Sequence, residues 1–398
     1  MSSEKPTINA PLDSFKVSTQ LQVLFQSTKP RMEPCETPDK STIERFNYPV
    51  ELHPVNTSDG YRLTMARIPA AGKPVLLLMH SFLSSSAEYT VLGPNMSLAL
   101  EAWDGGFDVW LANARGNTFS RSHRSLKPTE PEFWNFSFHE VGVYDLPAMI
   151  DYTLTVTNRK KLHFVGHSQG AVNFLVMASS LPEYNSKIAS AHLNSPVVFW
   201  SKNAIPYNLL DSEAIPAIQL MEEVGYYEIG GRTNEHFVDY LKGAIKYGLI
   251  GDDFLLMGVW MLLGEDRQGF NRSNLNAILE IFPAGGSIWQ AIHFTQTYQS
   301  GRFCQYDFGE EQNMVRYGNV TPPDYQLEKI TAPIALYYGL NDPLLVEEDL
   351  DKLAARLPKL MLKYRHPDPK WNHIDFIFGI NGYGVHQDIL KLARNYVH

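Results

Sequence analysis

Residues 162–177 read LHFVGHSQGAVNFLVM, and the order of apolar and small residues in this stretch decides the fold. Residues 162–165 are an apolar run typical of a buried strand, and residues 171–177 have the composition of a helix. Between them, Gly166-His167-Ser168-Gln169-Gly170 matches the G-x-S-x-G pattern, in which small residues permit a sharp turn that presents the serine hydroxyl. The stretch therefore predicts a strand, a turn and a helix, with Ser168 as a nucleophile at the turn.

Further short apolar runs flank this stretch, separated by segments of helical length. Such runs are typical of strands buried on both faces of a parallel sheet. A turn at Ser58-Asp59-Gly60 separates two alternating segments and predicts an antiparallel hairpin. The pattern predicts an α/β architecture, with a mostly parallel central sheet and helices on both faces. The expected hairpin strands are 50–55 and 61–68, the expected sheet strands are 75–79, 107–111, 162–165, 188–193 and 334–338, and a helix is expected over 144–155.

The rhythm of strand and helix divides the chain into regions. Residues 1–47 are polar and punctuated by proline, which predicts a poorly defined N-terminal arm. Residues 48–199 and 304–398 carry the α/β core. Residues 200–303 show helical patterns at 212–224, 233–247 and 252–263 without a convincing strand, and they predict a helical cap or lid inserted into the core.

Composition excludes several classes of function. The chain has 34 Lys and Arg against 43 Asp and Glu, for a net charge of −9, so it lacks the basic footprint that nucleic-acid binding requires. Cys35 and Cys304 are too few for a disulfide scaffold or a clustered metal site, and we expect both to be free thiols. No apolar run approaches the roughly 20 residues of a transmembrane helix, and no signal peptide is apparent.

Two signals leave the cellular compartment open. Five N-x-Ser/Thr sequons indicate either passage through the secretory pathway or chance, and the sequence does not decide between them. The sequons begin at Asn56, Asn95, Asn135, Asn271 and Asn319.

An activated serine requires a base, and the base requires an acid that orients it. Asp342 follows the apolar strand expected at 334–338, so it lies at the same sheet edge as Ser168. The alternative for Asp342 is an Asx-turn before Pro343. His373 follows 31 residues later in a predicted loop, which gives the chain order Ser, Asp, His of this type of triad.

Other residues compete for these roles. His366 is the main rival for the base, whereas Asp375 is expected to be a structural partner of its loop rather than the triad acid. The oxyanion hole is expected to use the backbone N–H groups of Gln169 and Phe82. We expect His80 to fix the loop rather than to act in catalysis.

Several long stretches resemble the acid lipase family that includes gastric lipase and lysosomal acid lipase. The matching segments cover nearly the whole chain from Tyr48 onward, and at matching positions the resemblance implies the same triad of Ser168, Asp342 and His373. One departure is Ser81, which stands where the family usually has glycine. A second is the missing cap disulfide of the mammalian members. The matching segments are 59–61, 67–69, 108–118, 144–151, 166–170, 284–285, 293–296, 306–309, 339–345 and 371–379.

The resemblance implies the α/β-hydrolase fold, with residues 48–199 and 304–398 as the hydrolase core. It also implies a serine hydrolase of fatty-acid esters, a triacylglycerol or sterol ester lipase. It implies a neutral lipid ester as substrate, met at a lipid interface, no metal or cofactor, and a secreted or lysosomal glycoprotein. Two alternatives stay open: an acyltransferase that uses the same triad, and a lipid-binding relative whose turnover was lost through Ser81. The apolar run at 254–263 is expected to be ordinary cap core, with contact to the acyl pocket or a lipid surface as the alternative. Acyl-chain preference, pH optimum and oligomeric state are outside what the sequence reveals.

Overall fold

The structure is a computed structural model that describes residues 38–200, 214–231, 243 and 251–396. Chain contacts divide the molecule into units 1–36 and 37–398, and every described residue belongs to the second unit. The predicted helix at 233–247 and residues 1–37 of the predicted arm lie outside the described residues, apart from Gly243.

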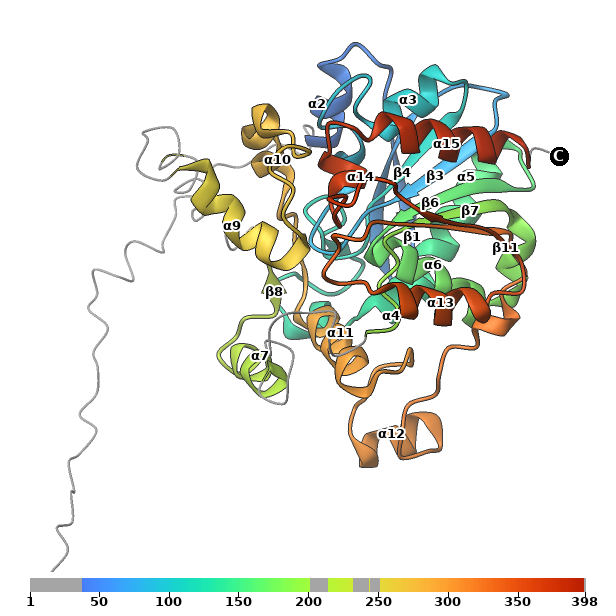
Figure 1. Ribbon diagram of the computed structural model, residues 1–398. Coiled ribbons are helices and arrows are strands. Elements are labelled where there is room, and N and C mark those ends of the chain that lie inside the picture. The colour runs from blue at the N-terminus through green and yellow to red at the C-terminus, as the bar shows by residue number, and fades with distance from the viewer. Residues whose placement is uncertain (1–37, 201–213, 232–242, 244–250, 397–398) are drawn as a thin grey trace, which may run out of the picture. The chain divides into compact units, whose positions relative to one another are not determined.

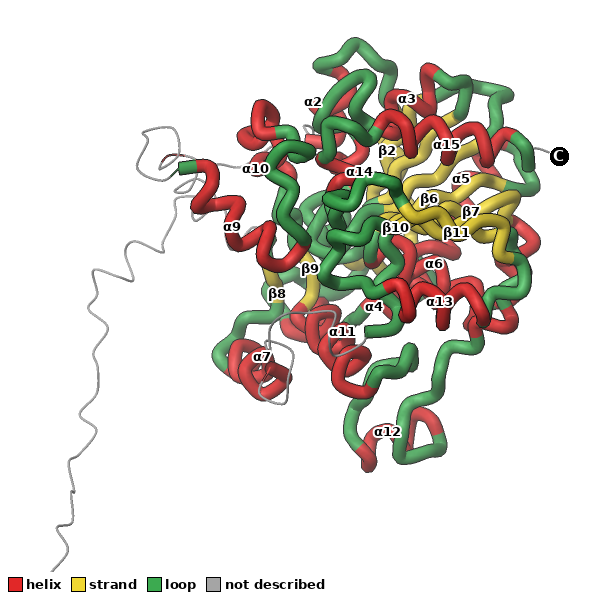
Figure 2. The backbone as a smooth tube through the Cα atoms, in the orientation of Figure 1, coloured by secondary structure: helices red, strands yellow, loops and turns green. Residues whose placement is uncertain are grey.

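A nine-stranded sheet forms the centre of the second unit, in the order β1-β2-β4-β3-β6-β7-β10-β11 with β5 paired to β2. β1 pairs with β2 and β2 with β4 in antiparallel fashion, and every pair from β4 to β11 is parallel. Figure 2 shows these strands side by side in yellow. The strands are β1 Glu51–Asn56, β2 Tyr61–Ile68, β3 Val75–Met79, β4 Asp108–Ala112, β5 Ser122–His123, β6 Leu162–His167, β7 Ile188–Asn194, β10 Ile334–Tyr338 and β11 Leu360–Arg365.

Successive residues of β3 alternate between the two hydrophobic clusters of the core. Val75, Leu77 and Met79 belong to one cluster, and Leu76 and Leu78 belong to the other. Because side chains on a strand point alternately to opposite faces, the sheet is buried on both sides, as the apolar runs predicted. Helices α5 (Leu146–Thr157), α6 (Gln169–Ser180) and α13 (Glu347–Ala355) contribute to the first cluster, and α3 (Leu98–Asp104) and α15 (Tyr383–Arg394) to the second (Figure 1).

The predicted strands are confirmed to within one or two residues at each end, and the hairpin forms around Gly60. The prediction missed β11 as a member of the sheet. β11 pairs only with β10, its residues 360–364 are half-buried and Arg365 is exposed. An edge strand that carries Lys363 and Arg365 lacks the continuous apolar run by which buried strands are recognised.

Between β7 and β10 the described residues form helices and one short pair of strands. Helix α9 is confirmed with the predicted bounds, and α7 lies inside the range predicted for it. The expectation of no strand in this region is wrong in one place, because β8 and β9 form a two-stranded antiparallel sheet of two residues each. Such short strands give no period-2 signal in a sequence. The elements of this region are α7 Ala214–Glu223, β8 Glu228–Ile229, α9 Asp252–Leu263, α10 Leu275–Ile281, β9 Gly286–Ser287 and α11 Ile288–Ser300.

Shorter helices connect these elements. Pro38–Glu44 forms α2, where Ile43 is fully buried and the Thr42 hydroxyl is hydrogen-bonded to that of Thr90 at 2.7 Å. No helix among the described residues combines the length and the apolar character needed to cross a bilayer. The remaining α-helices are α4 Phe138–Glu140, α12 Glu310–Tyr317 and α14 Asp375–Phe378, and Val141–Asp145 is a π-helix. Short 3₁₀-helices are formed by Ser86–Tyr89, Pro131–Trp134, Pro182–Lys187, Arg272–Asn274 and Leu327–Lys329.

Candidate catalytic site

Ser168 stands at the turn between β6 and α6 with a positive φ of 51° and a ψ of −115°. A non-glycine residue in this region is strained, and such strain persists only where the surroundings enforce it. The Ser168 N–H donates to the Asn194 carbonyl at 2.9 Å, which ties the turn to the end of β7. The serine side chain is therefore presented at the carboxyl edge of the parallel strands, as the sequence predicted.

The two glycines of the motif are required because there is no room for a side chain at either position. A Cβ atom at Gly166 would stand 2.6 Å from the Gly170 carbonyl carbon, and one at Gly170 would stand 2.2 Å from the Met79 carbonyl oxygen. Both contacts are with backbone atoms, which cannot move aside as a flexible side chain can. The turn that carries Ser168 is thus packed against the end of β3.

His373 and Asp342 form a buried hydrogen-bonded pair. The His373 Nδ1 atom lies 2.6 Å from the Asp342 Oδ2 atom, and both side chains are almost completely inaccessible to solvent. Because an ionised carboxylate only accepts hydrogen bonds, Nδ1 carries the proton and Nε2 is left as the acceptor. This is the tautomer that a general base needs.

Both interpretations of Asp342 hold at once. Its Oδ1 atom accepts the Leu344 N–H at 2.9 Å, which is the Asx-turn, while its Oδ2 atom accepts from His373. The imidazole of His373 also lies beside that of His167, the residue before Ser168, with ring centroids 5.1 Å apart. The acid and base from the C-terminal region are therefore brought to the serine turn.

The rival residues occupy other positions. His366 stacks on Trp371 with a centroid distance of 3.7 Å, and its Nδ1 atom accepts the Asp368 N–H at 3.3 Å. The Asp375 Oδ2 atom accepts the Asn372 N–H at 2.7 Å, and burial raises the pKa of this carboxyl to about 7. Asp375 thus supports the loop of His373, as expected.

A segment at the end of α9 binds the loops of both triad partners, a connection that sequence reasoning missed. The His373 N–H donates to the Leu263 carbonyl at 3.1 Å, and the Asn372 amide donates to the Gly264 carbonyl at 2.8 Å. The Asn341 amide donates to the Glu265 carbonyl at 2.9 Å. Residues 263–265 are therefore fixed to the acid loop and to the base loop; we call this segment the latch.

One predicted oxyanion donor, Gln169, follows Ser168 directly, and the other, Phe82, lies in the loop after β3. Gln169 is the first residue of α6, and the first N–H groups of a helix have no carbonyl within it to bind. Phe82 lies just after β3, and its ring is 5.9 Å from that of Phe294 in α11. Next to it, Leu83 has φ 57° and its carbonyl accepts the Ala284 N–H at 2.7 Å.

His80 fixes the Phe82 loop, as the sequence analysis expected. Its Nε2 atom accepts the Ala114 N–H at 3.0 Å, so Nδ1 carries the proton and donates to the Ser81 carbonyl at 2.7 Å. Burial lowers the pKa of His80 to about 4, so this imidazole is neutral at neutral pH.

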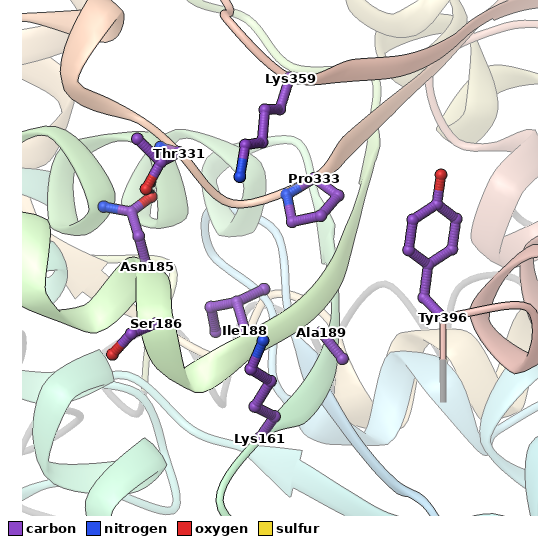
Figure 3. Close-up of a pocket in the computed structure, with 9 residues that line it drawn as sticks. All are labelled: Lys161, Asn185, Ser186, Ile188, Ala189, Thr331, Pro333, Lys359 and Tyr396. Atoms are coloured by element: carbon purple, nitrogen blue, oxygen red, sulfur yellow. Dashed lines mark hydrogen bonds between the residues drawn. The ribbon is translucent and has the colours of Figure 1, made fainter. Parts of the chain in front are cut away.

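A pocket of about 240 Å³ lies at the opposite edge of the sheet, where β6, β7, β10 and β11 begin. Figure 3 shows Lys161 and Lys359 on opposite sides of it. The Asn185 side chain in its wall is already bound to the Ala178 and Pro182 carbonyls and to the N–H groups of Thr331 and Ala332. This pocket is remote from the serine and takes no part in the site.

The remaining predicted features fall elsewhere. Cys304 is a buried free thiol, and Cys35 lies outside the described residues. In the part of the chain that the structure describes, no three His, Cys, Asp or Glu side chains are grouped to hold a metal ion. On α9, Leu256 and Trp260 are buried in the core while Met257, Met261 and Leu262 are exposed, so one face of the apolar run is core and the other is open.

Comparisons with known proteins agree with this arrangement. A family model described as the alpha/beta hydrolase fold matches residues 74–380, and one described as a partial alpha/beta-hydrolase lipase region matches residues 40–93. Lipase 1 of Drosophila melanogaster is 39% identical over 341 residues, which cover 85% of this chain and 75% of that protein. Gastric triacylglycerol lipase of Bos taurus is 34% identical over 361 residues, which cover 88% of this chain and 89% of that protein.

A solved structure shares the fold at much lower sequence identity. A putative lipase from Sulfolobus solfataricus aligns with a TM-score of 0.58 and 14% identity, covering 87% of this chain and 94% of that chain.

Proposed function

Because the chain belongs to the alpha/beta-hydrolase family and, within it, to the lipases related to gastric triacylglycerol lipase, we propose that Ser168, His373 and Asp342 are its catalytic triad. The protein is a carboxylic ester hydrolase of lipids. The observation that carries the assignment is the buried 2.6 Å hydrogen bond between His373 and Asp342, beside the strained turn of Ser168.

In the first half of the reaction, the Ser168 hydroxyl attacks the carbonyl carbon of the ester while His373 Nε2 takes its proton. The carbonyl oxygen becomes an oxyanion, which the N–H groups of Gln169 and Phe82 stabilise. Asp342 holds the imidazole tautomer and stabilises the imidazolium. The tetrahedral intermediate then collapses: the bond to the alcohol oxygen breaks, His373 protonates the leaving alcohol, and the acyl group remains on Ser168.

In the second half, water replaces the alcohol. His373 removes a proton from the water as its oxygen attacks the acyl carbon, and the same two N–H groups bind the new oxyanion. Collapse breaks the bond to Ser168, which recovers its proton from His373. The products are a fatty acid and free enzyme, and the side chains return to their starting protonation states.

We infer that the substrate is a neutral lipid ester, a triacylglycerol or a sterol ester, met at a lipid interface. The name of the bovine relative supports a triacylglycerol. Exposed apolar side chains on α7 and on α9 support the interface, because large apolar side chains in contact with water are unfavourable. They are Leu220 and Met221 of α7 and Met257, Met261 and Leu262 of α9.

The proposed division of labour follows the domain boundaries predicted from the sequence. Residues 48–199 and 304–398 form the hydrolase core, and residues 200–303 act as the cap over the acyl site. The latch supports this division, since residues 263–265 of the cap bind both triad loops.

A secretory or lysosomal location is proposed on the same footing. Asn56, Asn95, Asn135 and Asn319 are exposed, whereas Asn271 is 5% exposed and its amide is already hydrogen-bonded. Expression in a secreting eukaryotic cell should give glycans at the four exposed sequons and none at Asn271, as read by mass spectrometry before and after glycosidase treatment. An unglycosylated secreted product would contradict this proposal.

The decisive test of the activity compares the purified protein with Ser168→Ala on a short soluble ester and on an emulsified long-chain triacylglycerol. Loss of the serine should reduce turnover of both substrates by at least about 10³-fold, because nucleophile and base act as one unit. The control is Ser125→Ala, because Ser125 lies at an exposed loop position. A buried polar residue of α6 such as Asn173 would not serve, since its replacement could disturb the helix that follows Ser168.

The outcomes separate the alternatives. Turnover of the soluble ester alone would keep the triad but exclude a lipase. Formation of a new ester when an alcohol or sterol is added would indicate acyl transfer. Lipid binding without any turnover by the folded wild type would contradict the proposal and favour a lipid-binding protein.

A further inference from the structure

Ser81, which begins the loop that carries Phe82, has all three of its polar groups bound. Its N–H donates to Glu88 Oε1 at 3.2 Å, and its hydroxyl donates to Glu88 Oε2 at 2.8 Å. Its carbonyl accepts from His80 Nδ1 at 2.7 Å. The Ser81 side chain is therefore held in place by the Glu88 carboxyl group, seven residues further along the chain.

These bonds fix the direction of the next N–H group. The Ser81 carbonyl and the Phe82 N–H belong to one planar trans peptide, so they point in opposite directions. With the carbonyl held toward His80, the Phe82 N–H is directed to the other side of the loop. Rotation of this peptide would break the bond at His80 and the bond that the same carbonyl accepts from the Ser84 N–H at 3.3 Å, while the bonds to Glu88 fix the Ser81 residue from which the peptide extends.

We propose that Glu88 is a positioning residue of the oxyanion hole, which holds Ser81 by its N–H and its hydroxyl and thereby orients the N–H of Phe82. The inference rests on the proposed function, since it assigns Phe82 to that reaction. Glu88 does not touch the substrate; it acts through Ser81.

The environment of Glu88 favours this role over an ordinary surface carboxylate. The side chain is 2% exposed, and in the described part of the chain it forms no salt bridge with Lys, Arg or His. Burying a carboxyl without a cation lowers the free energy of unfolding unless its hydrogen bonds are made. If the position only had to fill space, an apolar residue would therefore be more stable there. The carboxyl instead binds the first residue of the oxyanion loop.

The other side of Phe82 is anchored as well. The Leu83 carbonyl accepts the Ala284 N–H, and Ala284 in turn accepts from the Thr118 N–H at 2.8 Å. Phe82 is thus flanked by two fixed residues, one held through Glu88 and the other through the segment before β9. Glu88 restrains Ser81, whose carbonyl shares a peptide group with the Phe82 N–H.

The test uses variants of Glu88 and Ser81. Burial raises the pKa of Glu88 to about 7, so in mildly acid solution the side chain is neutral and Glu88→Gln preserves its shape and its ability to accept from Ser81. Glu88→Leu preserves the volume and removes both hydrogen bonds. Ser81→Ala leaves Glu88 in place and removes only the hydroxyl bond.

The measurement is turnover of a soluble ester per active site, titrated with a fluorophosphonate that labels Ser168. Glu88→Leu should lower kcat by about 10–100-fold with KM within about twofold, since misdirecting a donor weakens the transition state and not the ground state. Affinity for a trifluoromethyl ketone, which forms a tetrahedral adduct on serine, should fall by the same factor. At pH 5.5, Glu88→Gln should stay within about threefold of the wild type.

A purely structural role predicts a different pattern: fewer titratable sites, with unchanged kcat for each one. That pattern would overturn the inference, as would wild-type kcat and inhibitor affinity in Glu88→Leu. If this variant does not fold, Ser81→Ala decides, with an expected loss of about 3–10-fold in kcat at unchanged KM; wild-type values there would overturn the inference. Failure of the proposed function would be distinguishable, because the wild type itself would then show no turnover that depends on Ser168.

Discussion

The serine turn and the loop of its base are held in place by different means. Ser168 is fixed mainly by close backbone packing, at Gly166 against Gly170 within β6-turn-α6 and at Gly170 against the Met79 carbonyl of β3. His373 is fixed by hydrogen bonds from separate parts of the chain, to Asp342 after β10 and to Leu263 in the latch. The position of the nucleophile therefore depends on steric packing of the backbone, and that of the base depends on hydrogen bonds between loops.

This difference has a consequence for how the two halves respond to change. Packing between backbone atoms leaves no intermediate arrangement, so an added methyl group either fits or displaces the turn. Hydrogen bonds between loops can be lost one at a time. We therefore expect mutations at the turn to affect folding, and mutations around His373 to affect activity first.

Gly170→Ala should give the largest effect. The new Cβ would lie 2.2 Å from the Met79 carbonyl oxygen, and relief would require moving β3 or α6. We expect a loss of more than about 3 kcal/mol in the free energy of unfolding, or no soluble protein. Gly384→Ala is the matched control, because that glycine lies in α15 with nothing within 4 Å of its Cβ position, and it should change stability by less than about 1 kcal/mol. Similar melting curves for both variants would show that the turn is not sterically fixed.

Asp342→Asn should leave the fold intact and reduce activity. The amide preserves the shape but presents its NH₂ group or stabilises the wrong imidazole tautomer, so kcat should fall by about 10³–10⁴-fold. Thermal unfolding should stay within about 5 °C of the wild type. The measurement is turnover of a soluble ester together with a melting curve. A loss of less than about tenfold would exclude Asp342 as the triad acid.

Gly264→Ala tests whether the cap positions the base. The backbone there has φ 96°, and a Cβ would lie 2.0 Å from the Asn341 carbonyl oxygen, so the latch must shift. We expect kcat to fall by about 10–100-fold, because a displacement near 1 Å in a catalytic group costs this much. Gly258→Ala is the control, since Gly258 lies inside α9, the helix that leads into the latch, and nothing lies within 4 Å of its Cβ position. Equal activity of the two variants would mean that the latch does not position His373.

Buried groups in β6, which leads into the serine turn, and in the loop of the base should change the free energy of unfolding in opposite directions when the pH falls. Burial lowers the pKa of His163 in β6 from 6.5 to about 4, so the unfolded chain binds more protons between these values. The stability contributed by His163 is therefore complete above pH 6.5 and is lost as the pH falls toward 4. Asp375 has the opposite sign: its raised pKa means that its contribution is complete in acid and is lost as the pH rises through 7.

This contrast predicts the smallest effects of the series, on the free energy of unfolding, which is measured by denaturant titration at pH 7 and at pH 5. His163→Gln, which can still hydrogen-bond Ser190, should make the loss of stability on acidification smaller by about 1–2 kcal/mol. Asp375→Asn should make that loss larger by a similar amount. Changes of the same sign in both variants would contradict the assignment of opposite pH responses.

Much of the site could be predicted because its signals are local. The G-x-S-x-G motif lies between a strand and a helix, and Asp342 directly follows an apolar strand, so chain order and sheet geometry were enough to choose them. His373 was chosen over His366 on order and loop placement, and its hydrogen bond to Asp342 agrees with that choice. The latch could not be predicted, since Asn341, Asn372 and Gly264 are 31 to 108 positions apart and carry no common pattern. Glu88 was missed for the same reason: a single acid in a short helical turn indicates nothing until its partner is known.

The sequence by itself determined the family, the order of the sheet strands along the chain and the residue types needed for ester hydrolysis. The family follows from the long stretches that resemble the acid lipases, and the strands and residue types follow from periodicity and short motifs, which depend on neighbours a few positions away. Only the tertiary structure decided which buried groups hold the catalytic loops: His80 and Glu88 around Ser81, and the latch around His373. The physical reason is that a hydrogen bond between distant segments depends on where the sheet brings them, and burial removes the water that would otherwise satisfy each partner.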